Sequence, residues 1–444
     1  MTAIVSNNFR LNAAKQLVDD AINSSSYYLF VGRSEEWTSD TSPDVPYDNT
    51  YSYHTDAWQR MHSLKEITDT DITYAVPRYQ WISGTTYVEY DDRDADLASK
   101  AYYVISDNNN VYLCLKSGGI STQNPDTTGV QTNGVIDFTS SDGYIWKYLF
   151  TVSTDDSNKF LTSAFIPLRY IETQPGVGAD TALSNQWDVQ QNAIDGAVYT
   201  IKVTNGGSGY TSTPSVDITG DGSNLAATAT VVGGVVTEIE VTNAGSGYNV
   251  CSVNITGGGG SNATAQAVLG PKGGFGADPR EDLKAHYITM NVRLVYDDGG
   301  GDFIVGNDFR QIGIIRNPYN YGTTTVATAS TLAATKNLVV ATGGTFAVDS
   351  VFEGTVTNAK GIVDSYDSVN GIIRYHQTEE TGYTAFTTSD NVRPDGGSGT
   401  GQSVTAVNNP EVEPFSGEII FLENRTPVNR ASDQIETIKL VLEF

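Results

Sequence analysis

The chain has 444 residues, and its 52 acidic against 26 basic side chains give a formal net charge of −26. This balance argues against a phosphate-binding surface, so nucleic acid is not an expected partner. The 44 glycines and 25 tyrosines, together with abundant threonine and valine, predict a mainly β protein.

Nothing in the sequence predicts export or membrane insertion. No apolar run approaches the ~20 residues that cross a bilayer, and the first residues lack signal-peptide character. The two cysteines, Cys114 and Cys251, have no partner at metal-ligand spacing, so we expect two unpaired thiols.

The first predicted element is a helix over residues 6–24, with Ser6 as its expected N-cap. A buried strand over 27–31 follows, and a short second helix is expected over 56–66. The apolar face of the first helix is predicted from a four-residue spacing that selects Phe9, Ala13, Leu17 and Ala21.

Strands are expected in the remainder of the first 174 residues. Residues 75–81 are predicted to be extended, because Pro77 biases the residue before it away from the helical region. Residues 102–105 and 111–115 flank a polar turn and indicate a hairpin, and residues 144–150 form a further strand.

An internal repeat marks the middle of the chain, where aromatic residues become rare. Residues 203–210 return as 241–248 at an offset of 38, and residues 215–220 return as 252–257 at an offset of 37. Each unit combines alternating strands with a glycine-rich turn. Two such copies predict one small β domain inserted into an older fold.

The aromatic strands resume after the repeat, with strands expected over 287–296 and 309–315. The tail holds two apolar runs, 418–422 and 435–444, which a turn around Pro427 is expected to separate. The second run alternates in the manner of a half-buried strand. Its expected inward side chains are Ile438, Leu440, Leu442 and Phe444.

The predicted fold class is therefore mainly β. We expect a discontinuous, β-sandwich-like α+β core with one N-terminal helix and two inserted small β domains. Long insertions are tolerated because loop closure costs little more as a loop lengthens. The predicted segments are 1–174 (core), 175–270 (inserted β-repeat domain), 271–320 (core), 321–409 (second inserted β domain) and 410–444 (closing strands of the core).

The sequence offers no candidate for catalysis or for binding a cofactor or metal. None of the four histidines belongs to an HExxH motif or forms a pair at zinc-ligand spacing. Asp92, Asp94 and Asp96 have the spacing that opens a calcium loop, but Leu97 stands where that loop needs glycine. The glycine clusters lack the Gly-Lys-Ser/Thr ending of a phosphate-binding loop. We therefore expect a protein that is not an enzyme.

Aromatic side chains beside arginines remain as candidates for binding. Tryptophan, tyrosine and arginine supply most of the binding free energy at protein interfaces. The alternative is that these large rings simply fill the core. The candidate interface residues are Arg33, Glu35, Trp37, Arg78, Trp81, Arg310 and Arg425.

Five segments, taken together and in order, carry a resemblance to a known family. They are VGRSEEW at 31–37, VPR at 76–78 with Trp81, DGYIWKYLF at 142–150, FRQIGIIRNP at 309–318 and SGEIIFLENR at 416–425. With them the chain resembles the small homodimeric baseplate wedge subunit of T-even-type contractile-tailed bacteriophages. The two glycine-rich insertions depart from the family pattern.

The resemblance implies a structural protein of the virion tail baseplate that is assembled in the host cytoplasm. Its expected partners are a second copy of itself and other baseplate wedge proteins, without nucleic acid and without membrane insertion. An alternative is a receptor-binding tail protein in which Tyr210 and Tyr248 of the repeat stack on a host-surface glycan. A polysaccharide-degrading enzyme is a third interpretation, for which the sequence supplies no identifiable acid pair.

Overall fold

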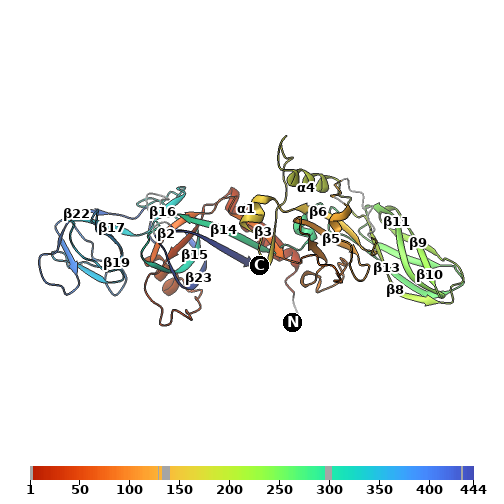
Figure 1. Cartoon of the computed structure of the whole chain (residues 1–444), viewed down its shortest axis with the longest axis horizontal. Coiled ribbons are helices and arrows are strands. Elements are labelled where there is room, and N and C mark those ends of the chain that lie inside the picture. Colours follow the sequence, from red (N-terminus) through yellow and green to blue (C-terminus); the bar gives the residue numbers. More distant parts are fainter. Residues whose placement is uncertain (1–3, 129, 133–140, 296–302, 432–433) are drawn as a thin grey trace. The chain divides into compact units, whose positions relative to one another are not determined.

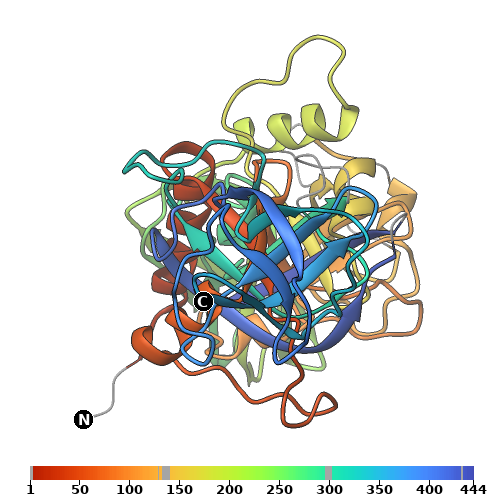
Figure 2. The same ribbon diagram turned by 90° about the vertical axis from the view of Figure 1, so that its left-hand side faces the viewer.

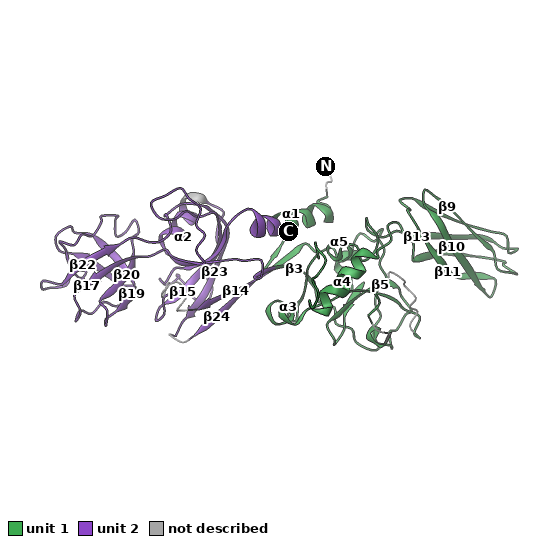
Figure 3. Ribbon diagram, turned by 90° about the horizontal axis from the view of Figure 1, so that it is seen from above, with its two compact units in different colours: residues 1–16, 73–289, 441–444 green, residues 17–72, 290–440 purple. Residues whose placement is uncertain are grey.

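The computed structural model describes residues 4–128, 130–132, 141–295, 303–431 and 434–444, and it is mainly β, as predicted (Figure 1). The chain forms two compact units, which are coloured separately in Figure 3. Unit 1 comprises Met1–Gln16, Thr73–Thr289 and Val441–Phe444, and unit 2 comprises Leu17–Ile72 and Met290–Leu440. The first predicted core segment, 1–174, is divided twice between the units, after residue 16 and after residue 72.

Helix α1 (Asn7–Asn23) forms where the sequence predicts it, and Ser6 Oγ accepts from the backbone N–H of Phe9 at 3.2 Å. The predicted apolar face is wrong in part, because Phe9 is 66% exposed. A strict four-residue spacing drifts around a helix of 3.6 residues per turn, whereas alternating steps of three and four stay on one face. The buried side chains follow that second pattern: Leu11, Ala14, Val18 and Ala21.

A five-stranded sheet in unit 2 joins segments that lie far apart in the sequence. Its order is β16-β2-β1-β15-β23, and it packs the side chains of Tyr28, Phe30, Ile315 and Ile419 into one cluster with Trp58. In the antiparallel register Tyr28 lies opposite Ile315, and Ile315 lies opposite Ile419. The strands are β1 (Tyr27–Gly32), β2 (Met61–Glu66), β15 (Asp308–Arg316), β16 (Thr331–Ala333) and β23 (Glu418–Asn429).

Two predictions for this unit are wrong in the placement of their elements. The predicted helix over 56–66 is only α2 (Thr55–Gln59), preceded by the π-helical turn η1 (Thr50–His54), because β2 pairs with strands on both sides. Pro427 lies inside β23 rather than in a turn. An edge strand tolerates proline, since the missing N–H would face away from the sheet.

The second insertion forms a closed barrel in unit 2, drawn in cyan to blue at the front of Figure 2. Its strand order is β17-β20-β19-β18-β21-β22, and its core stacks Phe352 on Phe386 with ring centroids 4.9 Å apart. The strands are β17 (Lys336–Val340), β18 (Val351–Gly354), β19 (Lys360–Asp367), β20 (Ile372–His376), β21 (Asn391–Pro394) and β22 (Gln402–Asn408).

In unit 1 a three-stranded sheet of order β4-β5-β6 contains the predicted hairpin of β4 (Tyr103–Ile105) and β5 (Asn110–Lys116) and then β6 (Ile145–Thr151). Strand β7 (Phe165–Leu168) pairs with β3 (Ile72–Pro77). Three short helices connect these strands: η2 (Leu97–Ser99), η3 (Pro125–Thr128) and α3 (Thr154–Lys159). A fourth, α5 (Pro279–Asp282), follows the repeat. Helix α4 (Thr181–Gln191), which the sequence analysis missed, places Val189 in the same core as Cys114. Both Cys114 and Cys251 are free thiols, as predicted.

The two repeat copies in unit 1 form one six-stranded sheet of order β10-β11-β8-β13-β12-β9. The copies are intertwined, because β8 of the first pairs with β13 of the second, and β11 of the second pairs with β10 of the first. The strands are β8 (Thr200–Ser208), β9 (Ser215–Gly220), β10 (Ser223–Val232), β11 (Val235–Ser246), β12 (Cys251–Thr256) and β13 (Ser261–Val268).

In addition, one tyrosine ring of each copy packs against glycines of the other copy. A Cβ atom at Gly260 would lie 2.4 Å from the Tyr210 ring, and a Cβ atom at Gly222 would lie 2.4 Å from the Tyr248 ring. Each tyrosine of one copy thus packs on glycines of the other, so neither copy has a complete core alone.

We expect Gly260→Ala to destabilise the repeat sheet by about 1–3 kcal/mol, because the added methyl group displaces the Tyr210 ring. Amide hydrogen exchange over residues 200–268 in the full chain measures the effect. Gly176→Ala is the matched control, since a Cβ atom there meets nothing within 4 Å. Equal exchange in the two variants would contradict the packing role of Gly260.

Three strands contribute residues to both units: β3, β14 (Tyr287–Val295) and β24 (Ile435–Glu443). The predicted strand over 287–296 ends at Val295, and Tyr296 lies outside the described residues. In the tail Ile438 and Leu440 are buried, while Leu442 and Phe444 are half-buried. Within unit 1 the Phe444 backbone N–H donates to the carbonyl of His286 at 3.1 Å, so the last residue is held.

Candidate functional site

Five of the seven predicted interface residues lie in unit 2, where the loop after β1 meets strand β23. The Arg33 guanidinium lies over the Trp37 ring, 3.8 Å from its centroid, and also forms an ion pair with Asp56 at 3.2 Å. The Trp37 indole Nε1 donates to the backbone carbonyl of Arg425 at 2.9 Å. The Arg425 side chain bonds Glu423 at 2.8 Å. Trp37 therefore covers the outer edge of β23 at this point and keeps part of its ring half-exposed.

Arg310 is buried beneath this loop, and only 4% of the residue is exposed. Its guanidinium donates to both carboxylate oxygens of Asp40, with Nε–Oδ1 and Nη2–Oδ2 distances of 3.0 and 2.9 Å, and to the backbone carbonyl of Ser34. These bonds hold the pKa of Asp40 below its usual range. The structure thus gives Arg310 an internal positioning role, and its contact with a partner stays a prediction.

Glu35 belongs to a buried cluster of charges between the five-stranded sheet and the barrel. Its Oε1 accepts from His376 Nε2 at 3.0 Å, and Arg60 lies 3.2 Å away. The other ring nitrogen of His376 contacts Asp364 Oδ1 at 2.8 Å, and His62 lies 3.5 Å from the same oxygen. The cluster joins residues that are more than 300 positions apart.

The pKa values in this cluster follow from the pairing. Burial alone would lower the pKa of His376, but the Asp364 and Glu35 carboxylates outweigh burial and raise it to about 10. Burial would raise the pKa of both carboxyl groups, yet His376 holds each at about 2. Both imidazole nitrogens of His376 face carboxylates, so the protonated ring is the form that satisfies the site.

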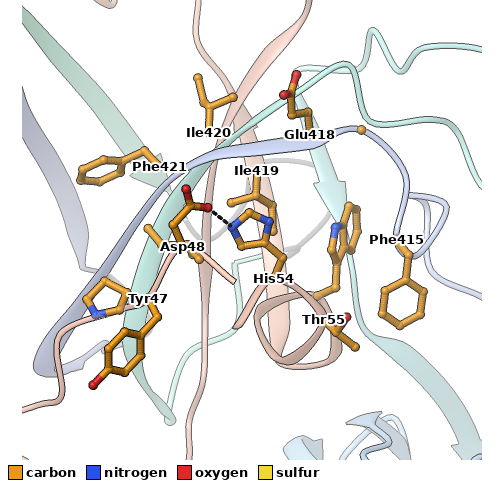
Figure 4. Close-up of a pocket in the computed structure, with 13 residues that line it drawn as sticks. Tyr47, Asp48, His54, Thr55, Phe415, Glu418, Ile419, Ile420 and Phe421 are labelled. Atoms are coloured by element: carbon orange, nitrogen blue, oxygen red, sulfur yellow. Dashed lines mark ion pairs between the residues drawn. The ribbon is translucent and has the colours of Figure 1, made fainter. Parts of the chain in front are cut away.

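Next to the Trp37 loop, an open groove of about 880 Å³ runs beside β23. We call it the edge groove. It is lined by residues 46–48, 54, 55 and 58 on one side and by 415 and 417–422 on the other. Figure 4 shows Asp48 and His54 on one side of the strand and the side chains of Glu418 and Ile420 on the other, while the Tyr47 ring points away from it.

Apolar side chains are unusually exposed around the edge groove. Phe415 is 57% exposed, Tyr47 67% and Ile420 40%. The Phe415 ring lies against Trp58, with centroids 6.3 Å apart, and its backbone φ of 62° is in the left-handed region. A bulky residue adopts that region at a cost, which is typical of functional positions. Phe415 cannot be selected from the sequence, because an aromatic residue beside Pro414 is not by itself a signal.

The other two predicted residues lie in unit 1 and are bound within it. Arg78 donates to the Thr162 carbonyl at 2.9 Å and to the Gln80 side chain at 2.8 Å. The Trp81 indole donates to Ser121 Oγ at 3.1 Å. The structure therefore does not bring these two residues into the Trp37 cluster.

The two tyrosines proposed to stack on sugars do not fit that role. Tyr210 and Tyr248 are 5% and 7% exposed, because each packs on glycines of the opposite repeat copy. A sugar needs an exposed ring face, so this assignment of the two residues is corrected here.

No protein-family model and no curated protein matches the chain. Across the described residues, no group of three or more acidic, histidine or cysteine side chains is arranged to hold a metal ion. None of the helices within those residues is long and apolar enough to cross a membrane.

Proposed function

We propose that this chain is a structural subunit of a contractile phage tail, in which it forms homodimers and binds other proteins of the baseplate wedge. The proposal makes it a virion component, assembled in the host cytoplasm. It assigns the chain no reaction and no cofactor. Its work is to hold neighbouring proteins in one arrangement and to permit another when the tail contracts.

The observation that carries the proposal concerns the segments on which the family resemblance is based. Three of them, 31–37, 309–318 and 416–425, include residues of the adjacent strands β1, β15 and β23 of one sheet, although 31–37 contains only the last two residues of β1. Segments that act together in assembly would need to meet in space in this way. They meet beside Trp37 and the edge groove, where aromatic and charged side chains remain exposed.

The receptor-binding alternative has less support, because the burial of Tyr210 and Tyr248 removes the rings that were proposed to stack on a glycan. The glycine-rich repeat is better explained as a decorating domain on the scaffold. A glycan partner would need side chains other than these two.

We expect Trp37→Ala to weaken wedge assembly about tenfold or more while the chain stays folded, because tryptophan truncations at interface centres often cost 2 kcal/mol or more. Arg33→Ala should act in the same direction, since Arg33 stacks on that ring. Light scattering of the purified chain, alone and mixed with the other wedge proteins, measures the dimer and the larger complex.

Tyr321→Ala is the control, because Tyr321 is an exposed aromatic residue of unit 2 (41%) that belongs to none of the three segments that meet beside Trp37. Unfolding of both the Trp37 and Arg33 variants would show that these residues are ordinary core. A wild-type chain that stays monomeric and binds no wedge protein would overturn the proposed function.

A further inference from the structure

The outer edge of strand β23 is open along one half only. β23 is the last strand of its sheet, and within the described residues no other strand pairs with its outer side. At Asn424 and Arg425 the loop after β1 covers the edge, through Asn424 Nδ2 to the Asp44 carbonyl at 2.7 Å and through Trp37. Residues 418–422 instead face the edge groove.

An open strand edge is a template for another strand, because its backbone N–H and C=O groups lack partners. Five residues of extended chain span about 17 Å, a typical strand length. Exposed apolar groups line the space that an added strand would enter: the rings of Phe415 and Tyr47, and the side chain of Ile420. The groove thus offers both backbone pairing and apolar contacts.

The charges that line the groove indicate which kind of partner strand it would bind. Asp48 and Glu418 lie on opposite sides of it, and their side chains are 101% and 68% exposed; Glu418 also forms a long ion pair, 3.7 Å from Nη1 of Arg316. Among the residues that line the groove, His54 is the one basic side chain, and it already lies 3.9 Å from Asp48. An acidic groove on a chain of net charge −26 attracts positive partners.

We propose that the edge groove binds an extended segment of another protein, one that alternates basic and apolar side chains and adds as a strand to β23. The inference rests on the proposed function, because it assumes that the chain acts by binding other proteins. It adds the chemistry of one partner and the strand that receives it. Backbone pairing supplies affinity, and the side chains on alternate faces supply specificity.

A second copy of the chain is the weaker candidate for this groove. Two copies would bring two acidic grooves together, which costs free energy. Arg425, the basic residue of β23 nearest to the groove, is already bound to Glu423 through its side chain and to Trp37 through its carbonyl. A homodimer is therefore expected to use another surface.

The test uses the full chain and the peptide Lys-Val-Lys-Val-Lys-Val-Lys. We expect fluorescence anisotropy to detect its binding, and hydrogen exchange to show protection of the amides of residues 418–422. A copy of the peptide N-methylated at alternate residues keeps the charge but cannot pair, so it should bind at least tenfold more weakly. The acidic peptide Glu-Val-Glu-Val-Glu-Val-Glu should not bind.

The double variant Asp48→Lys/Glu418→Lys should weaken binding of the basic peptide by about tenfold or more. Asp188→Lys/Glu240→Lys changes the net charge equally at exposed positions of unit 1 and should leave binding within about twofold of wild type. Equal losses in the two variants, or equal binding of the N-methylated peptide, would reduce the effect to general charge attraction and overturn the inference.

Two further outcomes separate this inference from the proposed function. Concentration-dependent protection of residues 418–422 in the chain alone would identify a second copy as the occupant and overturn the inference. If the basic peptide does not bind but the chain still forms the dimer and the wedge complex, the inference is wrong and the proposed function stands. If the chain binds the peptide but no wedge protein, the proposed function is wrong, while the binding property of the edge groove stands.

Discussion

Replacing His376 with alanine is expected to lower the free energy of unfolding of unit 2 by about 3–5 kcal/mol, because it leaves two buried carboxylates without their shared cation. Asp364 is fully buried and contacts His376 Nδ1 at 2.8 Å, and Glu35 contacts Nε2 at 3.0 Å. Arg60 and His62 remain nearby but lie farther from the two oxygens. Amide hydrogen exchange of β19 and β20 in the full chain measures the loss, since it does not require the whole chain to unfold in one step.

The pH dependence follows from the directions of the pKa shifts. The pKa of His376 is raised from 6.5 to about 10, so its contribution is complete below pH 6.5 and is lost as the pH rises toward 10. The pKa values of Glu35 and Asp364 are lowered from 4.5 and 3.8 to about 2, so their contribution is present above pH 4.5 and is lost as the pH falls toward 2. The stability that this cluster contributes should therefore be greatest between about pH 4.5 and 6.5.

The difference between wild type and His376→Ala should shrink between pH 6.5 and pH 10, because the wild-type ring loses its proton over that range. His54→Ala is the matched control, since His54 lines the surface groove and its one ion-pair partner among the described residues, Asp48, is 3.9 Å away. A loss of less than about 1 kcal/mol for His376→Ala, or a difference that does not change with pH, would mean that the cluster is not a charged one.

The strands were largely predictable because their signals are local. Alternating or continuous apolar runs gave β1, β5, β6 and β15 within one or two residues, and the repeat offset indicated one small β domain in the middle of the chain. Where a partner strand decides the structure, local signals fail. Residues 61–66 resemble the end of a helix, yet they are a strand because β1 and β16 lie on either side.

Helix α4 shows a second reason for failure. Its buried face carries Gln186 and Gln190 beside Ala182 and Val189, so the apolar periodicity is weak. The two glutamines are satisfied by backbone groups of Arg169 and Ile171. The one local signal is Asp180, whose side chain accepts from the backbone N–H of Ala182 at 2.9 Å.

The contacts of the candidate site also fall into local ones and ones that depend on distant strands. Arg33 and Trp37 were both selected from the sequence as interface candidates, and the structure places the guanidinium over the ring. The pairing of Trp37 with Arg425 and of Glu35 with His376 depends on where distant strands meet. A lone histidine near the end of a strand carries no signal that two carboxylates will enclose it.

Trp146→Ala is expected to destabilise unit 1 by about 3–5 kcal/mol, because the change removes a large ring from a packed core. Trp146 is 2% exposed, stacks on Tyr144 with centroids 5.2 Å apart and meets Tyr87 edge-on at 5.6 Å. Thermal unfolding, followed by the near-ultraviolet signal of the aromatic cluster, should show the loss. We expect no separate effect on the wedge contacts of unit 2.

Trp146→Phe is the informative control. The Trp146 Nε1 atom is buried and has no hydrogen-bond partner among the described residues, and leaving such a donor unsatisfied costs about 1–3 kcal/mol. Phenylalanine removes that donor and keeps most of the ring, so Trp146→Phe should lie within about 1 kcal/mol of wild type. Alanine at Trp37 should instead leave stability nearly unchanged and weaken assembly. If the two tryptophans responded alike in both assays, the distinction between a core ring and an interface ring in this chain would be wrong.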